Sequence, residues 1–224
     1  IVVVTDHYVP ADNAETQAIQ ALTKQWVQDQ SIDKFYDEQG ICHVVLPERG
    51  HLAPGLFCVG GDSHSPTGGA FGAYMFGIGA TEMAGVLATG EIWIKVPETI
   101  LMSWRNRLSA YVTAKDMMLA MCRKIGMGGG RYQAIQYAGQ TIQALSMQER
   151  MTLSNMAAEL GAQAGLIAPD EATVAFVQAA GGTVPANWRD LQIEAAESAE
   201  NVMQFDAASL EPQIAAPHSP ENAD

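Results

Sequence analysis

The sequence is poor in cysteine, and none of its cysteines stands in a metal-binding motif. Cys42, Cys58 and Cys122 are the three cysteines among 224 residues, and no two of them form a Cys-x-x-Cys pair. This spacing argues against a disulfide framework or a cysteine metal clamp. Their apolar neighbours favour reduced thiols that pack in a core, so we expect no metal ligand in this chain.

Basic residues are also scarce. The chain has 12 Lys and Arg against 25 Asp and Glu, which gives a formal net charge of −13. A protein of this charge repels nucleic acid and anionic membrane surfaces unless its basic residues cluster, and the sequence has no such cluster. We therefore expect neither a nucleic-acid partner nor a membrane partner.

Long apolar runs are missing too. The longest, residues 69–88, is interrupted by Thr81, Glu82 and repeated glycines, which argues against a transmembrane helix. No charged start followed by an apolar run marks a signal peptide, and we expect a cytoplasmic protein. The 48% share of hydrophobic residues is sufficient for one large core or two moderate ones.

The two ends of the sequence differ in character. Residues 1–5 predict a strand with no starting methionine and no turn before it, and from this we expect an internal piece of a longer protein. Residues 213–224 are rich in proline and polar groups. We expect them to form a polar C-terminal tail that leaves the packed body.

Predicted strands and helices alternate, which is the pattern of an α/β protein with ligand groups in the loops that follow its strands. Asn13, Thr113 and Asp170 precede amphipathic segments and are expected to cap helices. Pro97 indicates a hinge between two domains. The predicted strands cover residues 1–5, 40–46, 56–59, 91–100 and 134–137, and the predicted helices follow Asn13 and cover 70–87, 113–125, 146–164 and 170–180.

A glycine-rich loop, residues 60–69, follows the apolar segment 56–59 and carries Asp62, Ser63 and His64 between two glycine pairs. Glycines allow tight turns and close approach by a ligand, and Asp62 and His64 could share a proton there. The alternative is an Asx-type turn in which Asp62 caps the next helix, the common structural role of an isolated Asp-Ser-His.

Other polar groups strengthen the ligand hypothesis. Asp6 and His7 are adjacent, and His43 lies on an apolar segment. Asn155 and Glu159 stand one helical turn apart in the predicted helix 146–164, so they share one face of it. Taken singly, His43 is typical of a satisfied core histidine, and a mid-helix Glu usually faces solvent. Together they predict a polar pocket, because a histidine beside a carboxylate gains the raised pKa that general acid catalysis requires near neutral pH.

Several longer motifs occur in order along nearly the whole chain. They are Thr5-Asp6-His7, Gly40-Ile41-Cys42-His43, Gly61-Asp62-Ser63-His64-Ser65-Pro66-Thr67-Gly68-Gly69, Phe76-Gly77-Ile78-Gly79-Ala80-Thr81-Glu82 and Thr152-Leu153-Ser154-Asn155-Met156-Ala157-Ala158-Glu159. With these motifs the chain resembles the large subunit of aconitase-type hydro-lyases, particularly the 3-isopropylmalate dehydratase and homoaconitase branch. Ordered agreement of this extent is hard to obtain by chance.

This resemblance implies a fold and an activity. The implied fold is α/β with three-layer α/β/α aconitase-type domains, one partial over residues 1–97 and one nearly complete over 98–212, with a third domain absent. The implied intact protein is an enzyme, a hydro-lyase that dehydrates and rehydrates a hydroxy di- or tricarboxylic acid with a [4Fe-4S] cluster as Lewis acid. The implied partners are this acid and a small subunit that carries the swivelling domain.

The resemblance also implies roles for the polar groups. Asp6 and His7 would protonate the departing hydroxyl, and Asp62 would orient His43.

In the same way Glu159 would orient His64, Ser63 would contact a substrate carboxylate, and Asn155 would position iron-bound water. The family holds its cluster through cysteines in a Ser-Cys-Thr-Asn segment and a Cys-x-x-Cys segment, and neither occurs in this sequence. Its substrate-binding arginines and its catalytic serine base also belong to other segments or to the small subunit. We therefore expect this chain alone to bind no cluster and to be inactive.

Three alternatives to 3-isopropylmalate dehydratase, an enzyme of leucine biosynthesis, stay open. Homoaconitase and dimethylmalate dehydratase are alternatives within the family, because neither Thr67 nor the segment around Trp104 decides specificity. A binding or assembly module that keeps the fold without the metal is an alternative from another class. Trp104, Arg105 and Arg107 have no functional explanation in the sequence.

Overall fold

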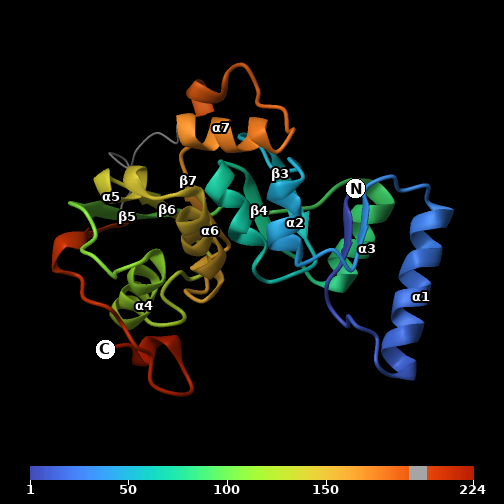
Figure 1. The fold of residues 1–224 in the computed structure, drawn as a ribbon, viewed down its shortest axis with the longest axis horizontal. Helices are drawn as coiled ribbons and strands as arrows, with labels where there is room; N and C mark the ends of the chain where they lie inside the picture. Colours follow the sequence, from blue (N-terminus) through green and yellow to red (C-terminus); the bar gives the residue numbers. More distant parts are fainter. Residues whose placement is uncertain (192–200) are drawn as a thin grey trace.

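Parallel strands and helices make up the protein in its computed structural model, which describes residues 1–191 and 201–224 (Figure 1). The α/β class predicted from the sequence is confirmed. The strands are β1 Val3–Thr5, β2 Phe35–Asp37, β3 Phe57–Gly60, β4 Tyr74–Gly77, β5 Thr99–Arg105, β6 Ala134–Ala138, β7 Ala164–Ile167 and β8 Asn201–Asp206. The α-helices are α1 Ala14–Asp29, α2 Cys42–Glu48, α3 Ala80–Thr89, α4 Ala114–Ile125, α5 Gln140–Ala144, α6 Met147–Asn155 and α7 Glu171–Ala179. The 3-10 helices are η1 Ser65–Phe71, η2 Met156–Ala158, η3 Trp188–Leu191, η4 Ala207–Ser209 and η5 Pro220–Asn222.

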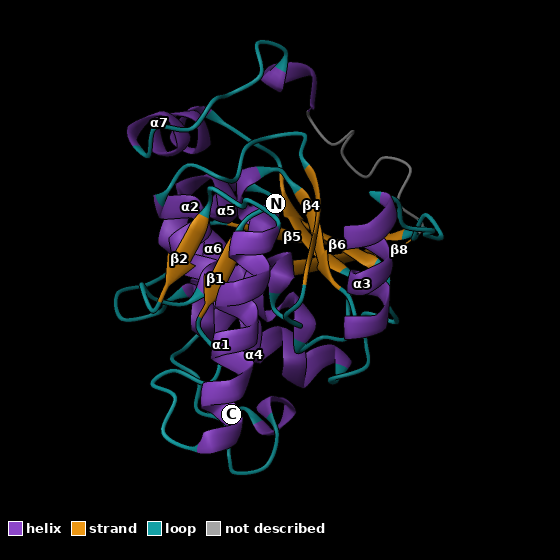
Figure 2. Cartoon of the chain, turned by 90° about the vertical axis from the view of Figure 1, so that its right-hand side faces the viewer, coloured by secondary structure: helices purple, strands orange, loops and turns teal. Residues whose placement is uncertain are grey.

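The strands of the described residues form three parallel sheets. β1 pairs with β2, β3 pairs with β4, and the third sheet has the order β7-β6-β5-β8. Parallel neighbours need a crossover connection, which α4 provides between β5 and β6, while α5 and α6 lie between β6 and β7. Figure 1 shows α1 at the end of the molecule remote from this four-stranded sheet, and Figure 2 shows β1 and β2 beside α1 and α2.

The larger core lies between the four-stranded sheet and helices α4 and α6. Trp104 and Tyr137 from the strands pack in one cluster with Met117, Met121 and Leu153 from the helices. The methionines are adaptable core fillers, in agreement with a helix that Thr113 caps and Gly126 ends. This core holds α6, and with it the segment that carries Asn155 and Glu159.

A second core surrounds η1 and joins the first half of the chain to the second. Every residue of η1 is buried, and Phe71 packs in a cluster with Leu52, Met75 and Val177. Gly69 lies against the backbone of Gly165 in β7, where a Cβ atom would collide with the Gly165 carbonyl oxygen. The loop that ends at His64 is therefore anchored by a rigid segment directly after it.

Four predicted elements differ from the structure. Residues 42–48 form the helix α2 and not a strand, and β4 lies within the predicted helix 70–87. The predicted strand 91–100 begins only at Thr99, and the predicted helix 146–164 ends at Asn155, with Ala164 in β7. Short apolar runs fit either a buried strand or a buried helix, so their periodicity could not decide between the two. β2 and β8 were not predicted.

The C-terminal segment 213–224 packs on α4, so the prediction that it leaves the body is wrong. The Gln213 N–H donates to Asp116 Oδ1 at 2.7 Å, and the Met127 N–H donates to Glu221 Oε2 at 3.1 Å. Ile214 and Asp224 exchange two backbone hydrogen bonds. The first two bonds attach the segment to Asp116 in the first turn of α4 and to Met127, two residues after its end. Among the described residues, no helix combines the length and the apolar character that crossing a bilayer requires.

Candidate functional site

Three histidines meet at one carboxylate, that of Asp62. Asp62 Oδ1 lies 2.8 Å from His43 Nε2 and 3.8 Å from His64 Nδ1, and Asp62 Oδ2 lies 3.4 Å from His7 Nε2. We call these histidines, together with Asp6, Asp62 and Glu159, the histidine cluster. Its members come from segments as far apart as residues 6 and 159, and the structure brings these segments together.

The loop after β3 positions Asp62 by an Asx-type turn. The His64 N–H donates to Asp62 Oδ1 at 2.7 Å, and the Ser65 hydroxyl donates to the Asp62 carbonyl at 2.6 Å. The Asx-type turn of the structural alternative is therefore present together with the His-carboxylate contacts, but Asp62 does not cap the next helix, because the N-cap of η1 is His64 and, among the described residues, no side chain caps it. Gly77 at the end of β4 allows the close approach of this loop, because a Cβ atom there would lie 2.5 Å from the Asp62 carbonyl oxygen.

Asp6 and His7 follow β1 and form the shortest pair of the cluster. His7 Nδ1 lies 2.6 Å from Asp6 Oδ1, and the Cys42 N–H donates to Asp6 Oδ2 at 2.7 Å. Burial raises the pKa of Asp6, but the hydrogen bonds from Cys42 and His7 outweigh it and hold this pKa below its usual value. The hydrogen bond to Asp6 raises the pKa of His7, and 64% of the His7 side chain is exposed. His7 can therefore hold a proton and reach a ligand.

His43 lies in the first turn of α2, and its side chain is more buried than that of His7. Burial acts to raise the pKa of Asp62, but the His64 N–H and the His43 imidazole overcome it and lower this pKa. Asp62 is thus an anion that holds His43 by Nε2. The sequence alternative of an ordinary core histidine does not fit, since His43 contacts a charged group that also faces two other imidazoles.

His64 is held from both sides of its ring. Its Nε2 lies 3.2 Å from Glu159 Oε1, and its Nδ1 lies 3.1 Å from the Ser63 hydroxyl. If Glu159 accepts the Nε2 proton, Nδ1 is the acceptor for the Ser63 O–H. The Asn155 amide donates to Thr67 Oγ1 at 2.9 Å, so Asn155 reaches the loop although α6 ends at that residue. The roles of Thr67 and of the Cys42 N–H could not be predicted from the sequence. Their hydrogen-bond partners lie 88 and 36 residues away, and such distant pairs leave no local pattern.

The cysteines of this chain do not fit an iron–sulfur ligand set. Burial, with Asp6 as the next cause, raises the pKa of Cys42 to about 12, so this thiol is protonated in the metal-free chain. Burial also raises the pKa of Cys122 to about 11, and this side chain packs in the larger core. Across residues 1–191 and 201–224, no three His, Cys, Asp or Glu side chains are grouped so that they could hold a metal ion.

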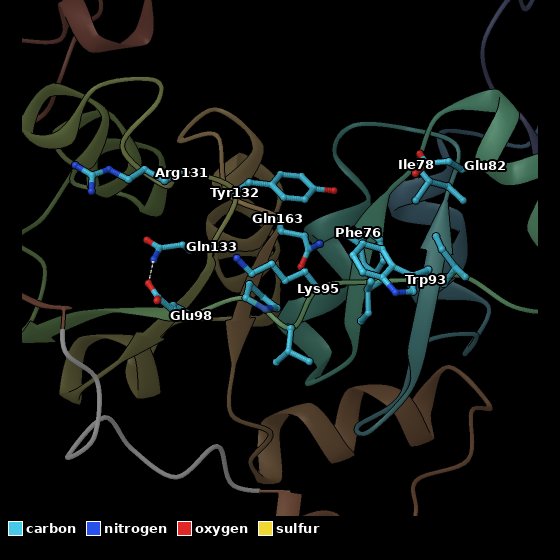
Figure 3. Close-up of a pocket in the computed structure, with 14 residues that line it drawn as sticks. Phe76, Ile78, Glu82, Trp93, Lys95, Glu98, Arg131, Tyr132, Gln133 and Gln163 are labelled. Atoms are coloured by element: carbon cyan, nitrogen blue, oxygen red, sulfur yellow. Dashed lines mark hydrogen bonds between the residues drawn. The ribbon is translucent and has the colours of Figure 1, made fainter.

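One hollow of the described part of the molecule borders the histidine cluster and another does not. A hollow of about 310 Å³ is lined by Asp6 together with Pro10, Glu38 and Ile41, so it opens beside the histidine cluster. A larger pocket of about 580 Å³ contains no histidine. Figure 3 shows Trp93 beside Phe76 at one side of this pocket, and the hydrogen bond from Gln133 to Glu98 at the other. The larger volume is therefore not where the titratable groups converge.

Comparison with known proteins decides the family. Residues 3–223 match the aconitase family (aconitate hydratase). The chain belongs to the aconitase family. It is 43% identical over 223 residues to a probable 3-isopropylmalate dehydratase large subunit of Methanothermobacter thermautotrophicus, and the match covers 99% of this chain and 52% of that protein.

Two further relatives match nearly the whole chain. A probable methanogen homoaconitase large subunit of Methanosarcina mazei is 43% identical over 223 residues, 99% of this chain and 56% of that protein. A 3-isopropylmalate dehydratase large subunit of Moorella thermoacetica is 37% identical over 225 residues, 100% of this chain and 53% of that protein. The chain spans about half the length of the curated relatives it matches.

Proposed function

We propose that this chain supplies the histidine–carboxylate half of the active site of an aconitase-type hydro-lyase that acts on a hydroxy di- or tricarboxylic acid. The observation that carries the proposal is the meeting of His7, His43 and His64 at Asp62. A hydro-lyase removes a hydroxyl from one carbon and a proton from the next, and the hydroxyl needs a proton to leave as water. A group of imidazoles with carboxylate partners is suited to deliver that proton.

In this proposal His7 is the acid. Its Nδ1 is engaged with Asp6, and its Nε2 lies 3.4 Å from Asp62 Oδ2, so the Nε2 proton passes to the substrate hydroxyl in place of this long contact. As the C–O bond breaks, the oxygen takes this proton and departs as water, and His7 becomes neutral beside Asp6. The proton on the neighbouring carbon goes to a base from another segment, since the family's serine base has no counterpart in the motifs of this chain.

The remaining groups orient the reactants. Asp62 fixes the ring of His43, and Glu159 fixes the ring of His64. Ser63 contacts a substrate carboxylate, and Asn155 holds the water. The three carboxylates of the cluster, Asp6, Asp62 and Glu159, repel a di- or tricarboxylate, so cationic side chains from outside this chain are required to bind it.

The cofactor of the intact protein is a [4Fe-4S] cluster, as in the family, held by cysteines outside these residues. When bound, it supplies a Lewis acid for the substrate hydroxyl. The relatives are named large subunits, which supports a small-subunit partner, and we propose that this partner carries the swivelling domain. Residues 1–97 belong in this proposal to the first family domain and 98–212 to the second, with the segment 213–224 after it. We propose a cytoplasmic location for the intact protein.

The substrate we favour is 3-isopropylmalate, because relatives named 3-isopropylmalate dehydratase large subunit are 43% identical to this chain. Homoaconitate is the second candidate, since a probable methanogen homoaconitase large subunit reaches the same identity. Dimethylmalate has no such support among these relatives.

The test is turnover by the full-length protein with its small subunit, loaded with iron and sulfide. We expect consumption of 3-isopropylmalate or homoaconitate, and at least a hundredfold loss of kcat in His64→Ala. His51→Ala is the matched control, because His51 pairs with Tyr36 and not with the cluster. An inactive wild type against all these acids, or a His64→Ala protein as active as His51→Ala, contradicts the proposal and favours a binding or assembly module.

A further inference from the structure

The hydroxyl of Thr67 links the two segments that carry the site. Thr67 Oγ1 donates to the His64 carbonyl at 2.6 Å and accepts from Asn155 Nδ2 at 2.9 Å. The side chain is buried in η1, and the residue as a whole is 3% exposed. One hydroxyl therefore connects the loop of Asp62 and His64 to the end of α6.

This connection has a definite direction. The single Thr67 proton is used on the His64 carbonyl, so toward Asn155 the hydroxyl can only accept. It thus selects the NH₂ group of the Asn155 amide and leaves the amide oxygen directed away from Thr67. The Thr67 hydroxyl is buried while Asn155 is half-buried, and a buried polar group is costly to leave unsatisfied, which favours this one orientation of the amide.

We propose that Thr67 is a positioning residue that fixes the amide of Asn155 with its oxygen available to accept a hydrogen bond from water in the site. This inference rests on the proposed function, in which Asn155 holds the water. Glu159 engages the ring of His64 from the same segment, so Thr67 and Glu159 secure the two ends of His64, its carbonyl and its imidazole. Thr67 itself touches neither substrate nor water.

The experiment compares Thr67→Val with Thr67→Ser in the full-length protein with its small subunit. Valine keeps the shape and removes the hydroxyl, whereas serine keeps the hydroxyl. Loss of one buried hydrogen bond corresponds to about tenfold, so we expect Thr67→Val to lower kcat about tenfold with little change in KM, and Thr67→Ser to restore it. Thr67→Ala replaces Thr67→Val if the valine variant does not fold.

Two controls separate positioning from folding. Thr141→Val removes another buried threonine hydroxyl, which donates to the Asn106 carbonyl at 2.8 Å away from the cluster, and it should leave kcat unchanged. In an Asn155→Ala background, Thr67→Val should have no further effect on kcat. The inference is overturned if Thr67→Val equals the wild type, if serine does not restore kcat, or if the loss persists without Asn155. An inactive wild type instead overturns the proposed function, and this inference with it.

Discussion

Asp62→Asn is the substitution that most directly disrupts the histidine cluster, because Asp62 faces all three imidazoles. Asparagine keeps the shape and can still accept the His64 N–H, so the loss falls on the charged contacts. The contact to His43 is 2.8 Å long and the contact to His7 is 3.4 Å. A charge-assisted hydrogen bond contributes about 1.5–3 kcal/mol. The Asp62 side chain is 21% exposed, and solvent weakens charged contacts, so we take about 3 kcal/mol for both contacts together. This value corresponds to a loss of roughly a hundredfold in kcat/KM.

The assay is steady-state turnover by the full-length protein with its small subunit. Asp116→Asn is a matched control, since Asp116 caps α4 through Thr113 and contacts the C-terminal segment, away from the histidines. We expect Asp116→Asn to lower the melting temperature and to leave kcat/KM near the wild-type value. An Asp62→Asn protein that keeps more than half of the wild-type kcat/KM would refute the reasoning, as would an equal loss of kcat/KM in Asp116→Asn.

Three further predictions concern stability, pH dependence and activity. The Arg150 side chain is 1% exposed and binds Asp170 at 2.7 Å, so Arg150→Met should lower the free energy of unfolding by about 3 kcal/mol. Arg189→Met breaks an exposed pair with Glu171 and should lower it by less than about 1 kcal/mol. Equal losses of the two variants in denaturant titrations would contradict this prediction. Asp6→Asn should lower the pKa of His7 in an NMR titration. Because the pKa of His7 is raised in the folded state, the stability that the Asp6–His7 pair contributes should be present below about pH 6.5. This contribution should disappear as the pH rises through the pKa of His7 in the folded protein. An unchanged His7 titration would count against the pair. Gly77→Ala should reduce kcat, because the added Cβ atom would collide with the Asp62 carbonyl oxygen. Gly85→Ala in α3 should leave kcat unchanged, because no atom lies within 4 Å of its Cβ position. Equal kcat values of the two variants would contradict this prediction and show that the loop tolerates displacement.

The sequence predicted the site better than it predicted the elements that carry it. Asp62 and His64 lie two residues apart in a glycine-rich loop, and the family motifs add His7 and His43, so the members of the cluster could be named. The helix that carries His43 was predicted as a strand, because the short, largely apolar segment 40–46 fits either structure. Thr67 could not be found, since its importance depends on a hydrogen bond to a residue 88 positions away.

The central claim is that His7, His43 and His64 share one carboxylate, while His51 and His218 do not. NMR of the full-length protein with isotope-labelled histidines tests this claim directly, because each imidazole reports its own surroundings. We predict that Asp62→Asn shifts the ring signals of His7, His43 and His64 together and leaves those of His51 and His218 in place. A shift in the ring signals of only one of these three histidines, or an equal shift in the ring signals of all five, would contradict the account.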